Sequence, residues 1–305
     1  MQWAIFLVDG RLLKVPSRPV STVRVIDQDE VAFRYGVYRN SAQVGQVDLH
    51  IEASVPDDAW LGVLPPMEMF VAGLQLPWDE DWLAIGVDLL SGLVADLPQS
   101  TPAVLQANTN LEVHEHPWRR VHLFEALRFE LFQEKHGYLW VDRGERLDVA
   151  LDTRSLDDLG DDGYAAIFSG VPSRGLDRND NYYYAATGPE NWARVMMTSL
   201  APEDRPSCLI GYVNDEPIGM VGLSAFDEED TGTIAYIGVL PDHRGRGLGR
   251  QLLLAATAAA RERGFKQILS DVDVLNIPMR TAMVACGHQP DLRPWHRWAH
   301  WLRLR

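Results

Sequence analysis

Residues Thr233 to Gln251 read TIAYIGVLPDHRGRGLGRQ, and this stretch organises the rest of the chain. Its first part, Thr233–Leu240, is apolar with β-branched and aromatic residues, which predicts a buried strand that Pro241 ends. A segment rich in glycine and arginine follows at residues 244–250, and then the run LLLAATAAARER, which has strong helix propensity. The sequence therefore predicts the order strand, glycine loop, helix.

A glycine loop that opens a helix is suited to bind an anion. Such a loop turns successive backbone N–H groups toward one point at the positive end of the helix dipole. Gly247 and Gly249 would let the backbone approach the anion closely, while Arg244, Arg246 and Arg250 add positive charge. The alternative is an ordinary strand-to-helix turn with a solvated basic rim. Three arginines within seven residues of an acidic chain favour the anion site.

The spacing of the loop residues identifies the kind of anion site. The loop matches neither the G-x-G-x-x-G pattern of dinucleotide-binding folds nor the G-x-x-x-x-G-K-[ST] pattern of P-loops. The pattern R-x-x-G-x-G from Arg244 to Gly249 follows a V-x-P strand end and closely resembles the acetyl-CoA pyrophosphate loop of the GNAT N-acetyltransferase superfamily. A strand over Gln267–Val272, then Asn276, a short helix and Gly287-His288, where the family usually has Gly-Phe, extend the resemblance over about residues 160 to 305.

The resemblance implies a mixed α/β fold, in which a mostly antiparallel central sheet is splayed between its fourth and fifth strands and flanked by helices. It also implies acetyl-CoA as co-substrate and direct acyl transfer to a primary amine in a ternary complex. Backbone groups at residues 237–239 would bond the pantetheine arm, residues 244–250 would hold the pyrophosphate, and Asn276 would cap the far wall. The residues so implied are Ile237, Gly238, Val239, Arg244, Gly245, Arg246, Gly247, Leu248, Gly249, Arg250 and Asn276.

The catalytic residues do not carry over from the family in the same way. The usual acid is a tyrosine seven residues after the asparagine, where this chain has Met283, which cannot donate a proton. The glutamate base of histone-type members is matched by Thr233. Tyr236, Asp271 and Asp273 are the remaining candidates, although the two aspartates also fit ordinary strand-end carboxylates. Otherwise the thiolate leaves unassisted and water relays the amine proton.

The first half of the chain contains an echo of the second. WLGVLPP at Trp60–Pro66 shares the residues GVLP with YIGVLPD at Tyr236–Asp242. The elements expected after it follow in the matching order: a helix at Asp81–Leu97, a strand at Ala103–Thr109, and a helix from about Trp118 to Lys135 that ends at Gly137. We expect an internal duplication into two tandem GNAT-like domains, a degenerate one over residues 1–152 and one with the acetyl-CoA site over residues 153–305.

The first copy lacks the phosphate chemistry. Where R-x-x-G-x-G should follow Pro65, the chain reads PMEMFVAGLQLP, which is acidic and has one glycine. We therefore expect no acetyl-CoA in that half. Further strands are predicted at Trp3–Val8, Arg11–Val15, Val31–Tyr38 and Gln46–Ala53, a hairpin at Ser207–Phe226, a linker at SLDDLGDDG (Ser155–Gly163), and an amphipathic helix at Trp192–Met197.

Composition sets the outer bounds on function. The chain has 305 residues, 46% of them hydrophobic, which is enough for two packed cores, and its net charge of −15 makes nucleic acid an unfavourable partner. Its two cysteines and scattered histidines give no disulfide framework and no metal site, and no apolar run reaches membrane-spanning length. We expect a cytoplasmic monomer or homodimer without metal, nucleic acid or membrane partners, acting on a small-molecule or peptide amine.

Two classes of function fit these features. The first is an N-acetyltransferase, and the second is a CoA-binding sensor or interaction protein with little or no turnover. A loop that holds ATP is a third possibility, testable by nucleotide-dependent heat stabilisation. The acceptor is not encoded in a portable motif. Tyr182, Tyr183 and Tyr184 fit either a cleft lining or packing against the interdomain surface.

Overall fold

The computed structural model describes residues 3–8, 11–16, 21–28, 32–51, 59, 61, 67–79, 81–97, 103–110, 114–198, 200–226 and 230–302. The chain forms two compact units. Unit 1 comprises Met1–Ser54, Leu64–Phe132 and Trp295–Arg305, and unit 2 comprises Val55–Val63 and Gln133–Pro294. Each unit is built around its own part of a mixed β-sheet, so each has its own core.

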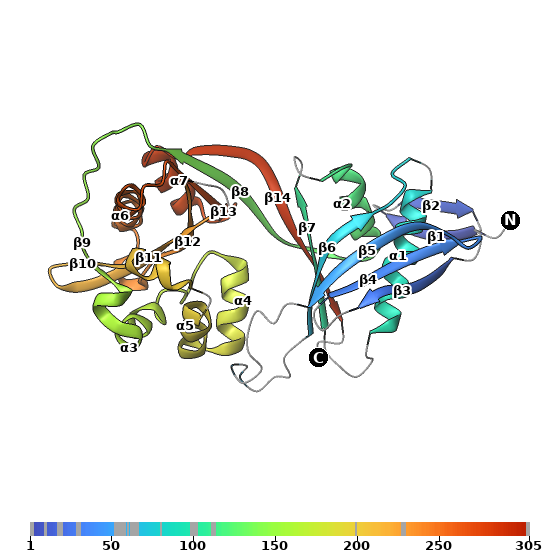
Figure 1. The fold of residues 1–305 in the computed structure, drawn as a ribbon, viewed down its shortest axis with the longest axis horizontal. Coiled ribbons are helices and arrows are strands. Elements are labelled where there is room, and N and C mark those ends of the chain that lie inside the picture. Colours follow the sequence, from blue (N-terminus) through green and yellow to red (C-terminus); the bar gives the residue numbers. More distant parts are fainter. Residues whose placement is uncertain are drawn as a thin grey trace. The chain divides into compact units, whose positions relative to one another are not determined.

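Unit 1 combines a hairpin with a sheet covered by two helices (Figure 1). The predicted hairpin is confirmed as β1 (Trp3–Val8) and β2 (Arg11–Pro16). The sheet has the order β3 (Thr22–Gln28), β4 (Ala32–Arg39), β5 (Ala42–Ile51), β6 (Met67–Gln75), β7 (Ala103–Asn110) and the end of β14 (Gln289–Leu302). Strands β6 and β7 are parallel and are joined by α1 (Trp82–Asp96), and α2 (Pro117–Ala126) follows β7. Buried Leu89, Leu93 and Phe124 anchor these helices in the core.

Unit 2 is a sheet with helices on both faces (Figure 1). Its strands follow the order β8 (Glu130–Val141), β13 (Gln267–Asp273), β12 (Thr231–Val239), β11 (Glu216–Ala225), β10 (Cys208–Val213) and β9 (Asp152–Ser155). Helices α3 (Leu156–Phe168), α4 (Arg178–Thr187) and α5 (Pro189–Thr198) lie on one face, and α6 (Leu248–Glu262) and α7 (Ile277–Ala285) on the other. Short 3-10 helices, η2 (Pro202–Ser207) and η3 (Pro241–His243), complete the unit. The predicted hairpin within Ser207–Phe226 is confirmed as β10–β11, and the helix predicted at Trp192–Met197 is confirmed as part of α5.

The two halves of the chain repeat the same order of elements. In each, four antiparallel strands lead into a helix, a fifth strand parallel to the fourth, and a further helix: β3-β4-β5-β6-α1-β7-α2 and then β9-β10-β11-β12-α6-β13-α7. The fourth strand carries one extra residue in both halves, Ala72 in β6 and Ala235 in β12. Such a bulge bends the strand at a defined position, so its presence in the fourth strand of both halves supports the repeat. The tandem layout is therefore present in the structure.

The last strand of each half lies in the sheet of the other unit. Strand β8 comes from the first half, yet it pairs antiparallel with β13 from Val141–Gln267 to Lys135–Asp273. Strand β14 comes from the second half and pairs with β7 from Trp295–Asn110 to Leu302–Ala103. The compact units therefore differ from the expected division between residues 152 and 153, because β8 belongs to the sheet of unit 2 and the end of β14 belongs to the sheet of unit 1.

The predicted helix from Trp118 to Lys135 is wrong in its second part. Helix α2 ends at Ala126, and Arg128 turns the chain with a left-handed φ of 61°, while the N–H of Phe129 bonds to the carbonyl of Phe124 at 2.9 Å. Strand β8 then begins at Glu130, so Gly137 lies in a strand and does not cap a helix. A glycine usually marks such a helix end, and here an arginine takes that conformation, which is why the sequence gives no stop signal.

The prediction of which segment in the first half corresponds to the glycine loop is also wrong. The shared GVLP at residues 62–65 lies outside the described residues. The stretch MEMFVAGLQ is strand β6 itself. Strand β6 corresponds to β12 of the second half, because each of them pairs parallel with the strand that follows it in the chain. The segment that leads from β6 to α1 is Leu76–Asp81, LPWDED, which has no glycine and three acidic residues. It is unlike a phosphate-binding loop.

The predicted linker at Ser155–Gly163 is wrong as well, because helix α3 begins there. Ser155 caps this helix: its Oγ accepts from the N–H of Asp158 at 3.1 Å, and Oδ2 of Asp158 accepts from the N–H of Ser155 at 2.8 Å. This is a capping box, which stabilises a helix start. Gly160 interrupts the helix with φ of 68°, so the Asp- and Gly-rich composition reflects a capped and kinked helix.

His288 is a buried histidine that directly precedes β14. It is 1% exposed, and among the described residues neither ring nitrogen has a hydrogen-bond partner. Burial lowers its pKa from 6.5 to about 4. Since the unfolded chain takes up the proton first, the free energy of unfolding should fall as the pH drops from about 6.5 toward 4, by at most about 3 kcal/mol.

The variant His288→Phe is expected to be more stable than the parent chain, because it removes two polar atoms that are buried without partners. At pH 8 the gain should be about 1 kcal/mol, and it should grow as the pH falls to 5. Urea unfolding at the two pH values measures both gains. An equal gain at pH 5 and pH 8 would show that titration of this imidazole does not limit stability.

Candidate functional site

Strands β12 and β13 separate along their length and leave one strand edge open. Their parallel pairing covers Thr231–Gln267 to Thr233–Leu269, and the bulge at Ala235 follows. On its other edge β12 stays paired with β11 as far as Val239. The edge of β12 that faces β13 is therefore free of that partner over residues 236–239, as the splayed sheet implied by the family resemblance requires.

A cavity of about 660 Å³ lies at this opening. It is bounded by the end of β12, the glycine loop, the start of α6, one face of α7, and the segment that precedes and begins α4. The lining includes ten of the eleven residues implied for the coenzyme, all except Arg246: Ile237, Gly238, Val239, Arg244, Gly245, Gly247, Leu248, Gly249, Arg250 and Asn276.

The glycine loop presents bare backbone to the cavity. Gly245 and Gly247 have φ of 74° and 75°, in the left-handed region that favours glycine, and Gly247 is the N-cap of α6. A Cβ placed on either glycine would meet no described atom within 4 Å. The fifteen-residue helix α6 begins at the next residue, so the loop amides and the positive helix end share one side of the cavity.

The arginines of the loop have different surroundings. Arg244 donates from Nε to the carbonyl of Val239 at 2.9 Å, from Nη1 to that of Arg174 at 2.8 Å, and from Nη2 to that of Val171 at 2.8 Å. Burial lowers its pKa. Arg244 thus has a structural role, because its hydrogen bonds connect the loop to residues 171–174. Nη1 of Arg246 lies 3.2 Å from Nδ1 of His243.

Two other arginines leave their charge available to the cavity. Arg174 and Arg250 line it, and among the described residues neither forms an ion pair with a carboxylate. Arg174 was missed from the sequence, because it lies far from the loop in the chain and its left-handed φ of 55° carries no sequence signal. The basic side of the cavity is therefore formed by Arg174 and Arg250 rather than by consecutive loop residues.

Tyr236 is the one of the three catalytic candidates that lines the cavity. Its ring packs edge-on against Phe168, with centroids 4.9 Å apart. Burial raises its pKa well above 10, and the charge and hydrogen bond of Asp180 raise it further, as does the charge of Asp177. The phenol therefore stays protonated at neutral pH.

Asp177 and Asp180 also line the cavity and were missed from the sequence. Asp177 is the N-cap of α4, where its Oδ1 accepts from the N–H groups of Asn179 at 2.9 Å and Asp180 at 3.1 Å. In the sequence, the two aspartates have the spacing of a helix N-cap and an acidic residue in the first turn. Many helices begin in this way, so the spacing does not indicate a functional site.

Asp271 and Asp273 are engaged elsewhere and do not line the cavity. Asp271 forms an ion pair with Nζ of Lys135 at 2.6 Å. Asp273 is buried and accepts from Nε of Arg178 at 3.0 Å, from Nε2 of Gln133 at 3.2 Å and from the N–H of Leu275 at 2.9 Å. Burial acts to raise its pKa, but the hydrogen bonds, that from Arg178 first, bring it below the ordinary value.

Gln133 joins this buried group to the cavity wall. Its Nε2 also donates to Oδ2 of Asp177 at 2.9 Å, so it links Asp177 to Asp273. Gln133 is fully buried and belongs to β8, the strand that the first half of the chain supplies. Nothing in its sequence surroundings, which read LFQEKHGY, indicates this role.

Met283 and Thr233, which stand where the family usually has its acid and its base, both lie outside the cavity lining. Met283 is buried in the core with Leu253 and Val272. Asn276 does line the cavity and caps α7, with Oδ1 accepting from the N–H of Met279 at 3.3 Å.

The three adjacent tyrosines pack rather than line the cavity. The Tyr183 ring stacks on Trp192 at 5.9 Å, and the Tyr184 hydroxyl donates to the carbonyl of Ser169 at 3.2 Å.

Two other kinds of site are absent from the part of the chain that the structure describes. Among these residues, no three His, Cys, Asp or Glu side chains come together as a metal-ligand group. None of the described helices is long and apolar enough to cross a membrane.

Comparison with known proteins gives consistent matches. Residues 178–287 match the model of the acetyltransferase (GNAT) family. An uncharacterized N-acetyltransferase of Methanocaldococcus jannaschii is 34% identical over 90 residues, which cover 28% of this chain and 38% of that protein. The match thus spans well under half of the relative's length.

Solved structures resemble nearly the whole chain. A GCN5-related N-acetyltransferase from Sphaerobacter thermophilus superposes with a TM-score of 0.58 and 13% identity, covering 91% of this chain and 82% of that one. A tandem GNAT protein from the clavulanic acid biosynthesis pathway gives a TM-score of 0.50 and 15% identity, covering 95% of this chain and 86% of that one. At such identities the likeness concerns the fold.

Proposed function

We propose that this chain is an acetyl-CoA-dependent N-acyltransferase that acts on a primary amine, because residues 178–287 match the model of the acetyltransferase (GNAT) family. The observation that carries the proposal is the make-up of one cavity. It joins a bare glycine loop and two arginines to a pair of carboxylates beside a protonated tyrosine. The first group suits a diphosphate, and the second suits a cationic amine.

The open edge of β12 and the loop would bind the coenzyme. The diphosphate would lie on the amides of Gly245–Gly249 at the start of α6, with Arg174 and Arg250 beside it. The pantetheine arm would then run along residues 237–239 like an added strand, because this edge lacks a partner from β13. Asn276, at the start of α7, would close the far side. The open space at Gly245 and Gly247 fits this arrangement.

The carboxylates and Tyr236 would serve the transfer. The amine nitrogen must be neutral to attack the thioester carbonyl, so a group has to accept its proton, and we assign this to Asp180. The C–S bond then breaks, and the thiolate sulfur would take up from Asp180 the proton that the amine gave up, directly or through a water. The Tyr236 hydroxyl, whose pKa is raised by burial and further by its hydrogen bond with Asp180, would keep its own hydrogen and hold that carboxylate in place. The direct attack requires both substrates in one ternary complex.

The first half of the chain would be a degenerate GNAT-like domain that does not bind acetyl-CoA. It repeats the order of elements and the bulge, but the segment after β6 offers three carboxylates where the second half has glycines and arginines. Negative charge at that position repels a diphosphate.

The proposed activity is tested by incubating the protein with acetyl-CoA and a panel of primary amines. Release of free CoA that requires an amine is the expected result. Tight coenzyme binding without turnover on any amine would favour the alternative, a CoA-binding sensor or interaction protein. Failure to bind CoA at all would refute both.

The variant Asp180→Asn is expected to lose about 100-fold in kcat/KM for the amine, because an amide cannot accept the proton. The affinity for CoA should stay unchanged, since the substitution keeps the shape of the residue and Asp180 belongs to α4 and not to the loop. Steady-state kinetics and calorimetry measure the two effects. Asp215→Asn, at an exposed hairpin turn, is the matched control and should behave as the parent chain. An unchanged kcat/KM in Asp180→Asn would remove Asp180 from the mechanism.

A further inference from the structure

Gln133 of β8 is a buried polar residue whose amide is directed at two carboxylates. It is fully buried, and its Nε2 donates to Oδ2 of Asp177 at 2.9 Å and to Oδ2 of Asp273 at 3.2 Å. Because an ionised carboxylate only accepts hydrogen bonds, the amide turns its NH2 group toward both, and among the described residues its Oε1 has no partner. A buried oxygen without a partner is destabilising, so packing alone does not account for a glutamine at this position.

The two carboxylates differ in their charge balance. Asp273 is paired with a cation, because Nε and Nη2 of Arg178 donate to its Oδ2 and Oδ1 at 3.0 and 3.3 Å. Asp177 receives neutral donors: two backbone N–H groups of α4 on Oδ1, and the Gln133 amide on Oδ2. Among the described residues, no Lys, Arg or His side chain forms an ion pair with Asp177. Its charge is therefore oriented by the protein but not neutralised by it.

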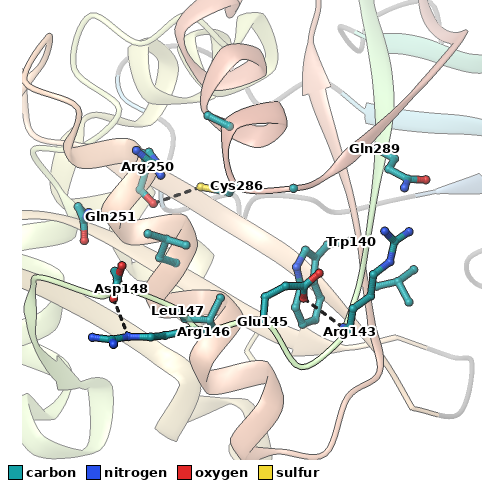
Figure 2. A pocket seen from close by; sticks show the side chains of 14 residues that line it. Trp140, Arg143, Glu145, Arg146, Leu147, Asp148, Arg250, Gln251, Cys286 and Gln289 are labelled. Carbon is teal, nitrogen blue, oxygen red and sulfur yellow. Dashed lines mark hydrogen bonds and ion pairs between the residues drawn. The ribbon is translucent and has the colours of Figure 1, made fainter.

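This negative charge lies at the cavity of about 660 Å³, which Asp177 lines. Burial raises the pKa of Tyr236, and the charges of Asp180 and Asp177 add to that rise, so both carboxylates lie near the phenol. A second cavity, of about 510 Å³, lies beside α6 (Figure 2). The two cavities share Arg250 and Ala285, but Asp177 does not line the second one. Its charge therefore belongs to the site proposed for the transfer.

The backbone around Gln133 is fixed by the sheet. Strand β8 pairs with β13 up to Lys135–Asp273, and the N–H of Val274 donates to the carbonyl of Glu134 at 3.0 Å. The side chain thus starts from a rigid element, which is what precise positioning of a carboxylate needs.

An amine acceptor would meet the charge of Asp177 as a cation. A primary amine such as that of lysine has a pKa of about 10, so it arrives at neutral pH as an ammonium ion. Its N–H groups suit a carboxylate that has no cationic partner. Asp180, to which we assign the proton transfer, follows three residues later and lines the same cavity.

We propose that Gln133 is a positioning residue for the acceptor: it holds the carboxylate of Asp177 where that carboxylate binds the ammonium group before the transfer. The inference rests on the proposed function, since it concerns the acceptor of the same reaction. Strand β8 comes from the first half of the chain. That half would therefore contribute to acceptor binding without binding the coenzyme itself.

The variant Gln133→Met keeps the length of the side chain and removes both donors. It should raise KM for the amine about tenfold and leave kcat and the affinity for CoA unchanged, because it weakens the binding of the ammonium group alone. The probe is the amine of the panel that the parent chain acylates fastest, studied by steady-state kinetics, with calorimetry for CoA. Gln267→Met is the matched control: it removes a hydrogen bond of 2.8 Å to Thr231 in the same sheet, lines neither cavity, and should keep the parental KM.

A second variant shows whether Gln133 acts through Asp177. Asp177→Asn keeps a good helix cap but loses the charge, so it should raise KM at least tenfold. The double variant Gln133→Met/Asp177→Asn should then have the KM of Asp177→Asn, because Gln133 has no further effect once that charge is gone. Effects on KM that multiply in the double variant would overturn the inference.

The remaining outcomes separate the inference from the proposed function. A loss of kcat or of CoA affinity in Gln133→Met without a change in KM would show a purely structural role and overturn the inference. An unchanged KM in Asp177→Asn would overturn it as well, even where Gln133→Met does not fold. A parent chain that releases no CoA with any amine of the panel would refute the proposed function itself.

Discussion

Replacing Gly247 with valine is expected to weaken CoA binding at least 100-fold. Gly247 is the N-cap of α6, and a Cβ there would occupy the open space in front of the loop amides. The branched side chain would keep a diphosphate from those N–H groups and from the positive helix end, so several charge-assisted hydrogen bonds would be lost together. Titration of the variant with CoA in a calorimeter measures the effect.

Gly264 provides a matched control for the backbone cost of that substitution. It also has a left-handed φ, 85°, and a Cβ there would meet no described atom within 4 Å, but it follows the far end of α6. Gly264→Val should therefore lose a similar stability, about 1–2 kcal/mol, and bind CoA as the parent does. A Gly247→Val variant with parental CoA affinity would show that the diphosphate does not lie on this loop.

The second half of the chain, residues 153–305, is expected not to fold when it is expressed alone. It lacks β8, so β13 would lose a partner along its whole length and expose a strand edge. Tyr138 and Trp140, both buried in unit 2, would be missing, as would Gln133, which holds Asp177 and Asp273. Circular dichroism and hydrogen exchange of the fragment should show little stable tertiary structure.

Adding the first half should restore the second. Residues 1–152 contain β8, and residues 153–305 contain β14, so the two fragments can each supply the strand that the other sheet needs. Co-expression should yield a soluble complex that binds CoA. A shorter partner, residues 1–128, lacks β8 and should fail to rescue. The prediction is contradicted if residues 153–305 alone are folded and bind CoA with the affinity of the full chain.

The fold and the side of the cavity that the glycine loop forms were accessible from the sequence because both depend on local patterns. A strand, a glycine loop and an alanine-rich helix follow one another within Thr233–Glu262, so their order in the chain is also their order in space. The opposite side of the cavity, which we propose for the acceptor, is different. Asp180, Tyr236 and Gln133 come together from α4, β12 and β8, and no local pattern brings three such distant segments to one place.

The strand exchange was missed for a related reason. The sequence of β8, ELFQEKHGYLWV, has a polar run followed by an apolar run and no strict alternation, so it also fits a continuing helix, and the helix end at Arg128 lacks the glycine that marks such ends. Pairing partners in a sheet are set by packing across the whole fold, which a reading of neighbouring residues does not capture.

The pairing of Ala103 with Leu302 has a consequence for synthesis on the ribosome. Strand β7 emerges well before its neighbour β14, so the first sheet has an uncovered edge while the chain between the two strands is translated. Native contacts between such distant segments form late, and an uncovered edge is open to wrong partners meanwhile. The nascent chain should therefore depend on holding factors until β14 has emerged, and a ribosome that stalls before that point should leave it prone to aggregate.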